Sequence, residues 1–222
     1  MKVALSGSTG RMGQALQELI KNTKGFQVTA EAHGGCSPSS WNPKNLDGVI
    51  DFSLPPLFSE TLSWCVTYKK PLVSGTTGLT AKQKKNLEQA AQKIPICYAT
   101  NMSWGVWLVK NWIKTLSPPS SFQIVLEDIH HKGKKDQPSG TALSLKSSFS
   151  PSLKRKVKVI SERRGREFGT HRIILRGEEE EILLQHKAFN RRVFAKGALR
   201  ALKWLKGRPP GLYSIDSIYQ SK

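Results

Sequence analysis

Short apolar runs alternate with helical patterns over the first hundred residues of the chain. The runs predict strands at residues 3–5, 26–30, 49–52, 72–74 and 94–98. Between the first two runs, Met12, Leu16 and Leu19 recur at helical spacing. The segments 57–65 and 82–93, which lie between later runs, also predict helices, the second of them polar and exposed. Strands that alternate with helices indicate βαβ units around a parallel sheet.

The pattern changes after Asn101. A helix is expected at 104–116, and a break follows at Pro118-Pro119. Further strands are expected at 122–129, 157–160, 172–175 and 181–185, and a last helix at 193–206 carries one apolar stripe. We therefore predict an α/β protein with a Rossmann-like domain, residues 1–102 completed by 195–222, and an inserted α+β domain at 103–194.

The composition adds a strong positive charge. The chain has 35 Lys and Arg against 16 Asp and Glu, a formal net charge of +19. Such a charge favours anionic ligands and is equally compatible with a nucleic-acid surface. The basic residues, however, are spread from Lys2 to Lys222 without a recognisable DNA- or RNA-binding signature. We therefore predict that most of the charge is solvated surface and that the chain has no specific nucleic-acid partner.

Cysteine usage and hydropathy narrow the class further. Cys36, Cys65 and Cys97 are odd in number and lie far apart, so we expect reduced thiols and no metal site. The apolar stretches fall far short of the roughly 20 residues that span a membrane, and the N-terminus lacks a signal-peptide core. These features predict a cytoplasmic protein without a membrane partner.

A glycine-rich segment directly follows the first predicted strand and opens the first predicted helix. Its sequence, from Gly7 to Gly13, is G-S-T-G-R-M-G. In this context the backbone amides approach a pyrophosphate, the helix N-terminus adds partial positive charge, and the last glycine lets helix and strand pack closely. The alternative is an ordinary glycine-rich turn, with Arg11 on the surface. The position between strand and helix favours dinucleotide binding.

The segment 127–143 carries the strongest motif, E-D-I-H-H-K-G-K-K-D-Q-P-S-G-T-A-L. An anionic substrate, such as a dicarboxylate, needs fixed cations and amide donors. His130, His131, Lys134 and the turn 139–141 that leads into a helix supply both. Proton transfer to a substrate also needs a group of tunable pKa beside a cation, which His130 and Lys134 provide. Ser139 and Thr141 are in addition candidates for the cap of that helix.

This motif resembles the signature of the dihydrodipicolinate reductase family. Matching blocks follow in the same order along nearly the whole chain, at 7–13, 51–53, 75–78, 101–106, 186–188 and 194–198. The chain is shorter than is usual for the family, chiefly between the second and third strands. The resemblance implies NAD(P)H-dependent reduction of 4-hydroxy-tetrahydrodipicolinate to tetrahydrodipicolinate, with NADPH, NADH or both as cofactor. It also implies a homotetramer, assembled through the sheet of the second domain.

The resemblance implies roles for individual residues. His130 would be the proton donor or acceptor and Lys134 the second proton donor, while the substrate contacts would be His131, Gly140 and Thr141, beside Ser139 of the same turn. The cofactor contacts would be Gly7, Ser8, Thr9, Gly10, Arg11, Met12, Gly75, Thr76, Thr77, Ala99, Thr100, Asn101 and Met102. As alternatives, Asn101 would only cap the helix that begins near Trp104, and Thr76 and Thr77 would only close a turn. We expect His171 and His186, which lie in the strand-rich part, to be packing histidines.

The choice of cofactor depends on the end of the second predicted strand. NAD-binding folds place an acidic residue there, which binds the adenosine ribose and repels a 2′-phosphate. In this chain His33 occupies that position, and Glu31 comes two residues too early. We therefore expect NADPH to be accepted at least as well as NADH, with His33 and Ser37 as candidate 2′-phosphate contacts.

Two other functions fit parts of the sequence. A related nicotinamide oxidoreductase acting on another cyclic or keto acid would keep the segment 7–13 but would not require the block 130–141. A catalytically inactive basic binding protein of the same fold predicts the loss of His130 or Lys134, and both are present. The reductase is therefore the favoured hypothesis.

Overall fold

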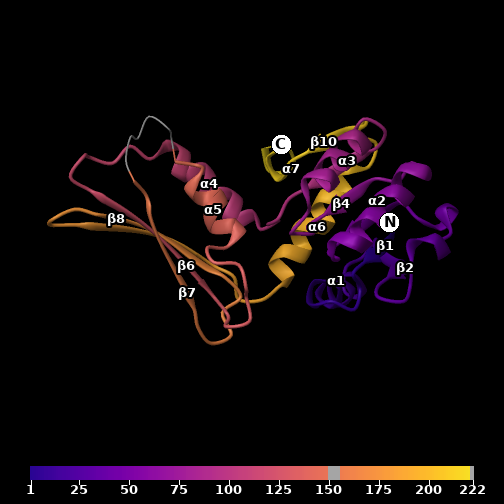
Figure 1. The fold of residues 1–222 in the computed structure, drawn as a ribbon, viewed down its shortest axis with the longest axis horizontal. Coiled ribbons are helices and arrows are strands. Elements are labelled where there is room, and N and C mark those ends of the chain that lie inside the picture. Colours follow the sequence, from indigo (N-terminus) through magenta and orange to yellow (C-terminus); the bar gives the residue numbers. More distant parts are fainter. Residues whose placement is uncertain (150–155, 221–222) are drawn as a thin grey trace. The chain divides into compact units, whose positions relative to one another are not determined.

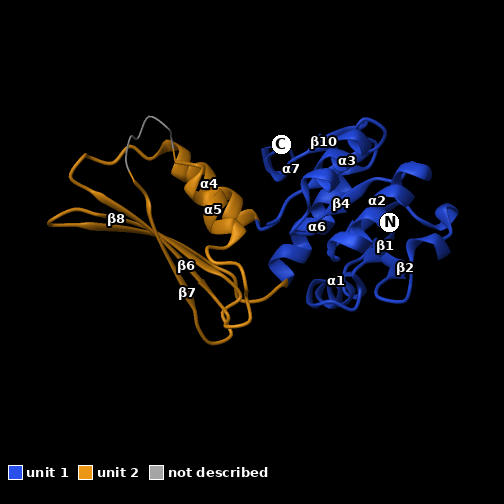
Figure 2. Cartoon of the chain, in the orientation of Figure 1, with its two compact units in different colours: residues 1–103, 192–222 blue, residues 104–191 orange. Residues whose placement is uncertain are grey.

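The computed structural model describes residues 1–149 and 156–220, which fold into two compact units (Figures 1 and 2). Unit 1 comprises Met1–Ser103 and Arg192–Lys222, and unit 2 comprises Trp104–Arg191. The chain therefore leaves unit 1 once and returns to it, and each unit contains a sheet of its own.

Unit 1 is built on a six-stranded parallel sheet with the strand order β10-β5-β4-β3-β1-β2. The strands are β1 (Lys2–Ser6), β2 (Gln27–Ala32), β3 (Gly48–Asp51), β4 (Leu72–Ser74), β5 (Pro95–Tyr98) and β10 (Gly211–Tyr213). The chain places β2 on one side of β1 and β3 on the other, so the order reverses between β1 and β3. In such sheets a ligand binds beyond the carboxyl ends of the strands at this reversal.

Helices cover the sheet of unit 1 (Figure 1). They are α1 (Arg11–Lys21), α2 (Pro55–Thr67), α3 (Ala81–Ala91), α6 (Arg192–Leu205) and α7 (Ile215–Gln220), with short 3-10 turns η1 (Pro38–Ser40) and η2 (Pro43–Asn45). Helix α6 contacts α1 and the central strands β3, β4 and β5, and its buried residues include Ala198, Leu202 and Leu205. Full burial of a leucine contributes about 1.5–3 kcal/mol, so this stripe secures the returning segment to unit 1.

The last part of the chain differs from the sequence prediction. No element was expected after residue 206, but β10 pairs with β5 in parallel, with Leu212 beside Ile96, and α7 follows. Strand β10 has only three residues and follows Pro209-Pro210, so it is too short to show a periodic pattern. Its pairing with β5 depends on a long-range contact.

Unit 2 contains a mixed sheet with the order β7-β6-β8-β9. Its elements are α4 (Trp104–Thr115), β6 (Gln123–His130), α5 (Gly140–Lys146), β7 (Lys158–Arg163), β8 (Thr170–Arg176) and β9 (Glu181–Lys187). Strands β6 and β7 are parallel, and the other pairs are antiparallel. Val109 and Ile113 of α4 and Leu145 of α5 pack with Leu126 and Ile173 of the sheet. The predicted α/β fold, a Rossmann-like sheet with a second mixed sheet, is thus confirmed.

Alternate residues of the unit 2 sheet point to its other face. That face carries the buried Val125 and Ile174 together with Ile160 and Leu183, which are 41% and 52% exposed. We call these four residues the open sheet face. Exposed apolar strand faces of this kind require cover from another surface.

Candidate cofactor and catalytic sites

The glycine-rich loop joins β1 to α1 at the carboxyl end of the sheet. The backbone amides of Gly7 and Ser8 donate to the carbonyl of Ala32, at 2.8 and 3.2 Å, which anchors the loop to the end of β2. A Cβ at position 13 would lie 2.3 Å from the carbonyl oxygen of Gly7, so only glycine lets α1 start this close to the loop. The N-cap Gly10 provides no side-chain cap. The first amides of α1 are therefore suited to a phosphate.

The other two predicted cofactor segments lie at the same edge of the sheet. Residues 75–77 follow β4, and residues 99–102 follow β5. Parallel strands end at a common edge, so the structure brings all three segments to the carboxyl side of one sheet. The amide of Ala99 donates to the carbonyl of Ser74 at 3.1 Å, and the carbonyl of Met102 accepts from Tyr219 at 2.9 Å.

A buried carboxylate in the matching block 51–53, to which the sequence analysis assigned no role, organises this edge. Asp51 ends β3, and its Oδ2 accepts hydrogen bonds from Thr76 Oγ1 and Ser74 Oγ, both at 2.7 Å. Burial raises the pKa of Asp51, and hydrogen bonds from four hydroxyl groups oppose that shift. The hydroxyl of Thr76 therefore joins two loops, while Thr77 is exposed. The sequence feature that could have identified Asp51 is its position as a carboxylate at the end of the buried strand β3.

The end of β2 positions the residue predicted to face the adenosine ribose. His33 directly follows β2 and exchanges two backbone hydrogen bonds with Cys36 across a tight turn. The carboxylate of Glu31 accepts from Gln17 of α1 at 2.8 Å. Ser37 Oγ donates to the carboxylate of Glu60 at 3.0 Å. Glu31 is thus bound to α1, and His33 stands at the carboxyl end of the strand.

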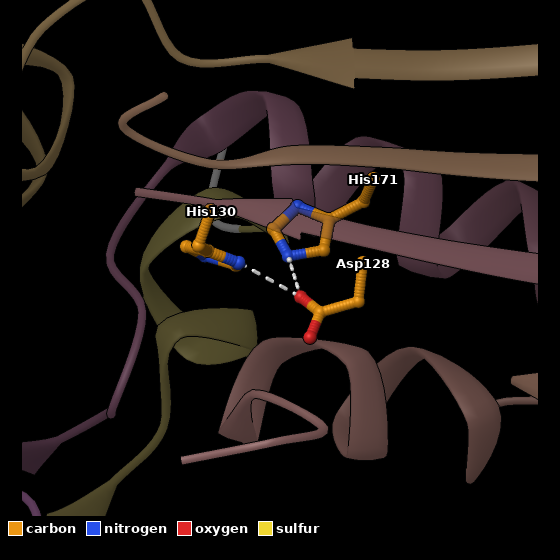
Figure 3. A group of neighbouring side chains, drawn as sticks. All are labelled: Asp128, His130 and His171. Atoms are coloured by element: carbon orange, nitrogen blue, oxygen red, sulfur yellow. Dashed lines mark ion pairs between the residues drawn. The ribbon is translucent and has the colours of Figure 1, made fainter. Parts of the chain in front are cut away.

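In unit 2, three buried polar side chains meet at one end of the mixed sheet (Figure 3). Asp128 and His130 lie two residues apart on β6, and His171 lies opposite Asp128 on β8. Asp128 Oδ1 is 2.9 Å from Nδ1 of His130 and 3.4 Å from Nε2 of His171. We call these three residues the Asp128 cluster. The expectation that His171 only packs was therefore incomplete.

The carboxylate of Asp128 has further partners. The backbone amide and hydroxyl of Ser139 donate to its two oxygens at 2.8 and 2.7 Å, and Arg163 Nη2 lies 3.2 Å from Oδ2. Burial acts to raise the pKa of Asp128, but hydrogen bonds from His130, His171 and Ser139 outweigh it and keep the pKa well below its ordinary value. Asp128 is therefore ionised. Its lone pairs are occupied and a guanidinium lies beside it, so we assign no metal to the cluster.

Burial also keeps two histidines of this sheet neutral. His171 lies opposite His186 of β9, and their rings stack with centroids 6.2 Å apart. Burial lowers the pKa of His171, although its hydrogen bond with Asp128 opposes the shift. Burial and the neighbouring His171 lower the pKa of His186 to about 4. His171 and His186 thus form a neutral pair, with His171 beside the carboxylate of Asp128.

The remaining predicted catalytic and substrate residues follow β6 in the chain. Lys134 Nζ lies 2.7 Å from Oδ1 of Asp136. Ser139 is buried and caps α5, since its hydroxyl also accepts from the amide of Ala142 at 3.1 Å. Gly140 is exposed at the start of that helix, and the amide of His131 donates to the carbonyl of Glu167 at 2.8 Å. The structure therefore gathers His130 and Ser139 around Asp128. Ser139 is buried, and its hydrogen bonds to Asp128 and Ala142 hold the turn 139–141 in place.

The fold and these residues define the class of protein. A switch point beside a glycine-rich loop, together with a second domain that carries histidine and lysine, is the arrangement of a dinucleotide-dependent oxidoreductase. None of the helices in the described residues is long and apolar enough to cross a membrane.

Comparison with known proteins identifies the family. The family model for the N-terminus of dihydrodipicolinate reductase matches residues 1–102, and the model for its C-terminus matches residues 105–219. A 4-hydroxy-tetrahydrodipicolinate reductase of Bdellovibrio bacteriovorus is 37% identical over 227 residues, covering 100% of this chain and 97% of the relative. The enzyme of the same name from Rickettsia bellii is 36% identical and covers 100% and 95%.

A solved structure agrees at the level of fold. A dipicolinate-bound dihydrodipicolinate reductase from Paenisporosarcina sp. TG-14 superposes with a TM-score of 0.75 and 22% identity, covering 96% of this chain and 97% of that one. The chain belongs to the dihydrodipicolinate reductase family, whose members are nicotinamide-dependent oxidoreductases of lysine and diaminopimelate biosynthesis.

Proposed function

We propose that this chain reduces 4-hydroxy-tetrahydrodipicolinate to tetrahydrodipicolinate with a nicotinamide cofactor. The observation that carries the proposal is the ionised Asp128 beside His130, at the start of the signature segment that ends in the α5 turn. Membership of the family supports the same reaction. An inactive binding protein of the same fold predicts the loss of His130 or Lys134, and both are present.

Unit 1 holds the cofactor in this proposal. The loop Gly7–Met12 would bind the pyrophosphate through the backbone amides of Thr9 and Met12 and through Arg11. Gly7, Ser8 and Gly10, whose amides are bound within the protein, would shape the loop around it. The segments Gly75–Thr77 and Ala99–Met102 would line the path of the nicotinamide half. Thr76 would support this path from inside, since its hydroxyl is bound to Asp51, its amide to Ser74 and its carbonyl to Tyr98. A nicotinamide bound there supplies the hydride.

Unit 2, the inserted domain, binds the substrate in this proposal. One carboxylate of the substrate would bind the amides of Gly140 and Thr141 at the start of α5, and His131 and Lys134 would bind the other polar groups. Ser139 supports the turn through Asp128 and the helix cap. The small dicarboxylate is thus held by backbone amides and cations.

The proton chemistry is assigned to His130 and Lys134. Loss of the 4-hydroxyl group as water takes one proton onto that oxygen and releases one from the neighbouring ring carbon, which gives an unsaturated imine. Hydride addition to this conjugated system leaves electron density that a positioned acid must protonate. His130 is nearly buried, so bulk water does not replace it as the donor. Lys134 supplies a second proton once the substrate has separated it from Asp136.

We further propose that NADPH is accepted at least as well as NADH. His33 and not an acidic residue follows β2, so a 2′-phosphate meets no carboxylate at that position. Glu31 is bound to Gln17, and Ser37 must turn from Glu60 to reach the phosphate.

The chain is also proposed to form a homotetramer through the unit 2 sheet. Ile160 and Leu183 make the open sheet face apolar and exposed, and a second copy of the same face is its natural complement.

A coupled assay tests the proposed reaction. The preceding synthase generates the substrate, and consumption of NADH and NADPH is followed separately at 340 nm in the presence and absence of this protein. We expect synthase-dependent oxidation of the cofactor. If neither cofactor is consumed, while a known reductase is active in the same mixture, the proposed function is wrong.

A further inference from the structure

The register of two strands places Asp128 against His130 and His171. Residues 128 and 130 of β6 point to the same face of the sheet, and Asp128 lies directly opposite His171 in the antiparallel pair with β8. All three side chains are at least nine-tenths buried. The position of the carboxylate is therefore set by the sheet and not by a movable loop.

The two oxygens of Asp128 have different partners. Oδ2 accepts from the amide of Ser139 and lies 3.2 Å from Arg163. Oδ1 accepts from the hydroxyl of Ser139 and faces Nδ1 of His130 at 2.9 Å. This nitrogen is buried and lies within hydrogen-bond distance of the carboxylate, although its N–H is not aligned with an acceptor among the described residues. Hydrogen bonds in catalytic sites often align only when the substrate is bound.

We propose that Asp128 is a positioning residue for the reduction, and this inference rests on the proposed function. Its carboxylate accepts the Nδ1–H of His130 and so makes Nε2 the nitrogen that exchanges a proton with the substrate. Through Ser139 the same carboxylate fixes the turn at Gly140 and Thr141. The one buried carboxylate thereby determines the tautomer of His130 and the position of the anion-binding turn.

The surroundings of Nε2 agree with this assignment. Gly169 lies beside that nitrogen, and a Cβ at position 169 would be 3.1 Å from it. Gly169 has a φ of +146°, a conformation that residues with side chains rarely adopt. Glycine at this position therefore leaves Nε2 without a crowding side chain. No comparable opening is needed at Nδ1, which faces the protein interior.

His171 does not compete for the same role. Its Nε2 is 3.4 Å from Oδ1, farther than Nδ1 of His130, and burial lowers its pKa, so it remains neutral. Arg163 uses the other oxygen and also donates to the carbonyl of Asp128 at 3.1 Å. Oδ1 is thus left to His130 and Ser139.

Nitrogen-15 NMR of the histidine side chains in the full-length protein tests the proposal. The chain has five histidines, and comparison with His130→Gln assigns the His130 signals. At about pH 9, where histidines are neutral, we expect the wild-type His130 ring to carry its proton on Nδ1. A wild-type ring protonated on Nε2 would overturn the proposal, and this measurement needs no variant at position 128.

Asp128→Asn provides the second test, with Glu127→Gln as the matched control. Glu127 is the adjacent carboxylate of β6, pairs with Arg172 at 3.3 Å and points to the opposite face. An amide at position 128 can donate to Nδ1, so we expect the proton of His130 to move to Nε2 and kcat to fall by about 100- to 10,000-fold. Glu127→Gln should retain the wild-type tautomer and kcat.

The outcomes separate this inference from the proposed function. An unchanged tautomer in a folded Asp128→Asn protein, or a changed tautomer with unchanged kcat, would contradict the positioning role. A fall in kcat without a tautomer change would mean a purely structural role and also overturn it. An inactive wild-type protein whose His130 carries the proton on Nδ1 would refute the reaction, while the contact between Asp128 and His130 would stand.

Discussion

Lys134 Nζ lies 2.7 Å from the carboxylate of Asp136, two residues further along the signature segment. Burial acts to raise the pKa of Asp136, but the hydrogen bond and charge of Lys134, together with backbone hydrogen bonds from Asp136 and Gly140, lower it. The carboxylate of Asp136 thus engages Lys134 and the amide of Gly140, two of the groups proposed to bind the substrate. Asp136 therefore holds Lys134 close to the α5 turn before substrate arrives.

Loss of either proton carrier should abolish most of the activity. We expect His130→Ala and Lys134→Ala each to lower kcat by about 100-fold or more, the usual scale for a positioned acid–base group. Nucleotide affinity should be nearly unchanged, because the glycine-rich loop belongs to the other unit. Lys135→Ala, which changes an adjacent exposed lysine, is the control. Steady-state kinetics and nucleotide titration provide the two readouts, and wild-type turnover in either variant would refute the assignment.

The cofactor preference tests whether His33, and not Glu31, lies beside the adenosine ribose at the end of β2. Loss of one charge-assisted hydrogen bond to the ribose costs about 1.5–3 kcal/mol, or on the order of 10- to 100-fold in NADH affinity. We expect kcat/KM for NADPH to equal or exceed that for NADH. His33→Asp should shift the preference toward NADH, because it restores the ribose acceptor. A wild-type preference for NADH above about tenfold would show that Glu31 leaves Gln17 and reaches the ribose.

Acid should destabilise the folded protein through its neutral histidines. The pKa of His186 is about 4 in the folded chain against 6.5 ordinarily, so the unfolded chain binds more protons between these values. Stability therefore falls as the pH drops from 6.5 toward 4. We expect the urea midpoint to decrease between pH 7 and pH 5, and to decrease less in His186→Gln. An equal decrease in both proteins would assign the acid sensitivity to other groups.

A charge on the open sheet face should disrupt assembly. We expect Ile160→Lys and Leu183→Lys to lower the molar mass measured by light scattering, because a buried lysine in the interface lacks a partner. Leu143→Lys serves as the control, since Leu143 is equally exposed but lies on α5. If the wild-type protein is a monomer, or if the two sheet variants assemble like the wild type, subunits do not meet at this face.

Salt should weaken the binding of the anionic ligands. The net charge of +19 attracts cofactor and substrate over a distance that ionic strength limits to about 8–10 Å. We expect KM for both to rise modestly between about 0.05 and 0.5 M salt. Nucleic acid should bind weakly and without sequence preference in a filter-binding assay. A tight, sequence-selective complex at physiological salt would revive the hypothesis of a binding protein.

The sequence by itself determined most of the local structure. Apolar periodicity, the glycine spacing at 7–13 and the block 127–143 depend on neighbours in the chain, so they predicted the strands β1 to β5, the loop before α1 and the signature segment. Gly13 is an example, because the same residue that marks the motif is the one that lets α1 approach β1. Short-range steric and hydrophobic constraints leave a direct trace in the order of residues.

Only the tertiary structure decided which polar groups meet. Asp51 binds Thr76 because β3 and β4 are neighbours, and Asp128 faces His171 because β6 and β8 pair in one particular register. Shifting either register by one residue would turn these side chains to the opposite face of the sheet. Strand β10 likewise exists because β5 offers an edge to three residues that follow two prolines. Such contacts depend on strand order and register, which the packing of the whole domain sets and local residue spacing does not encode.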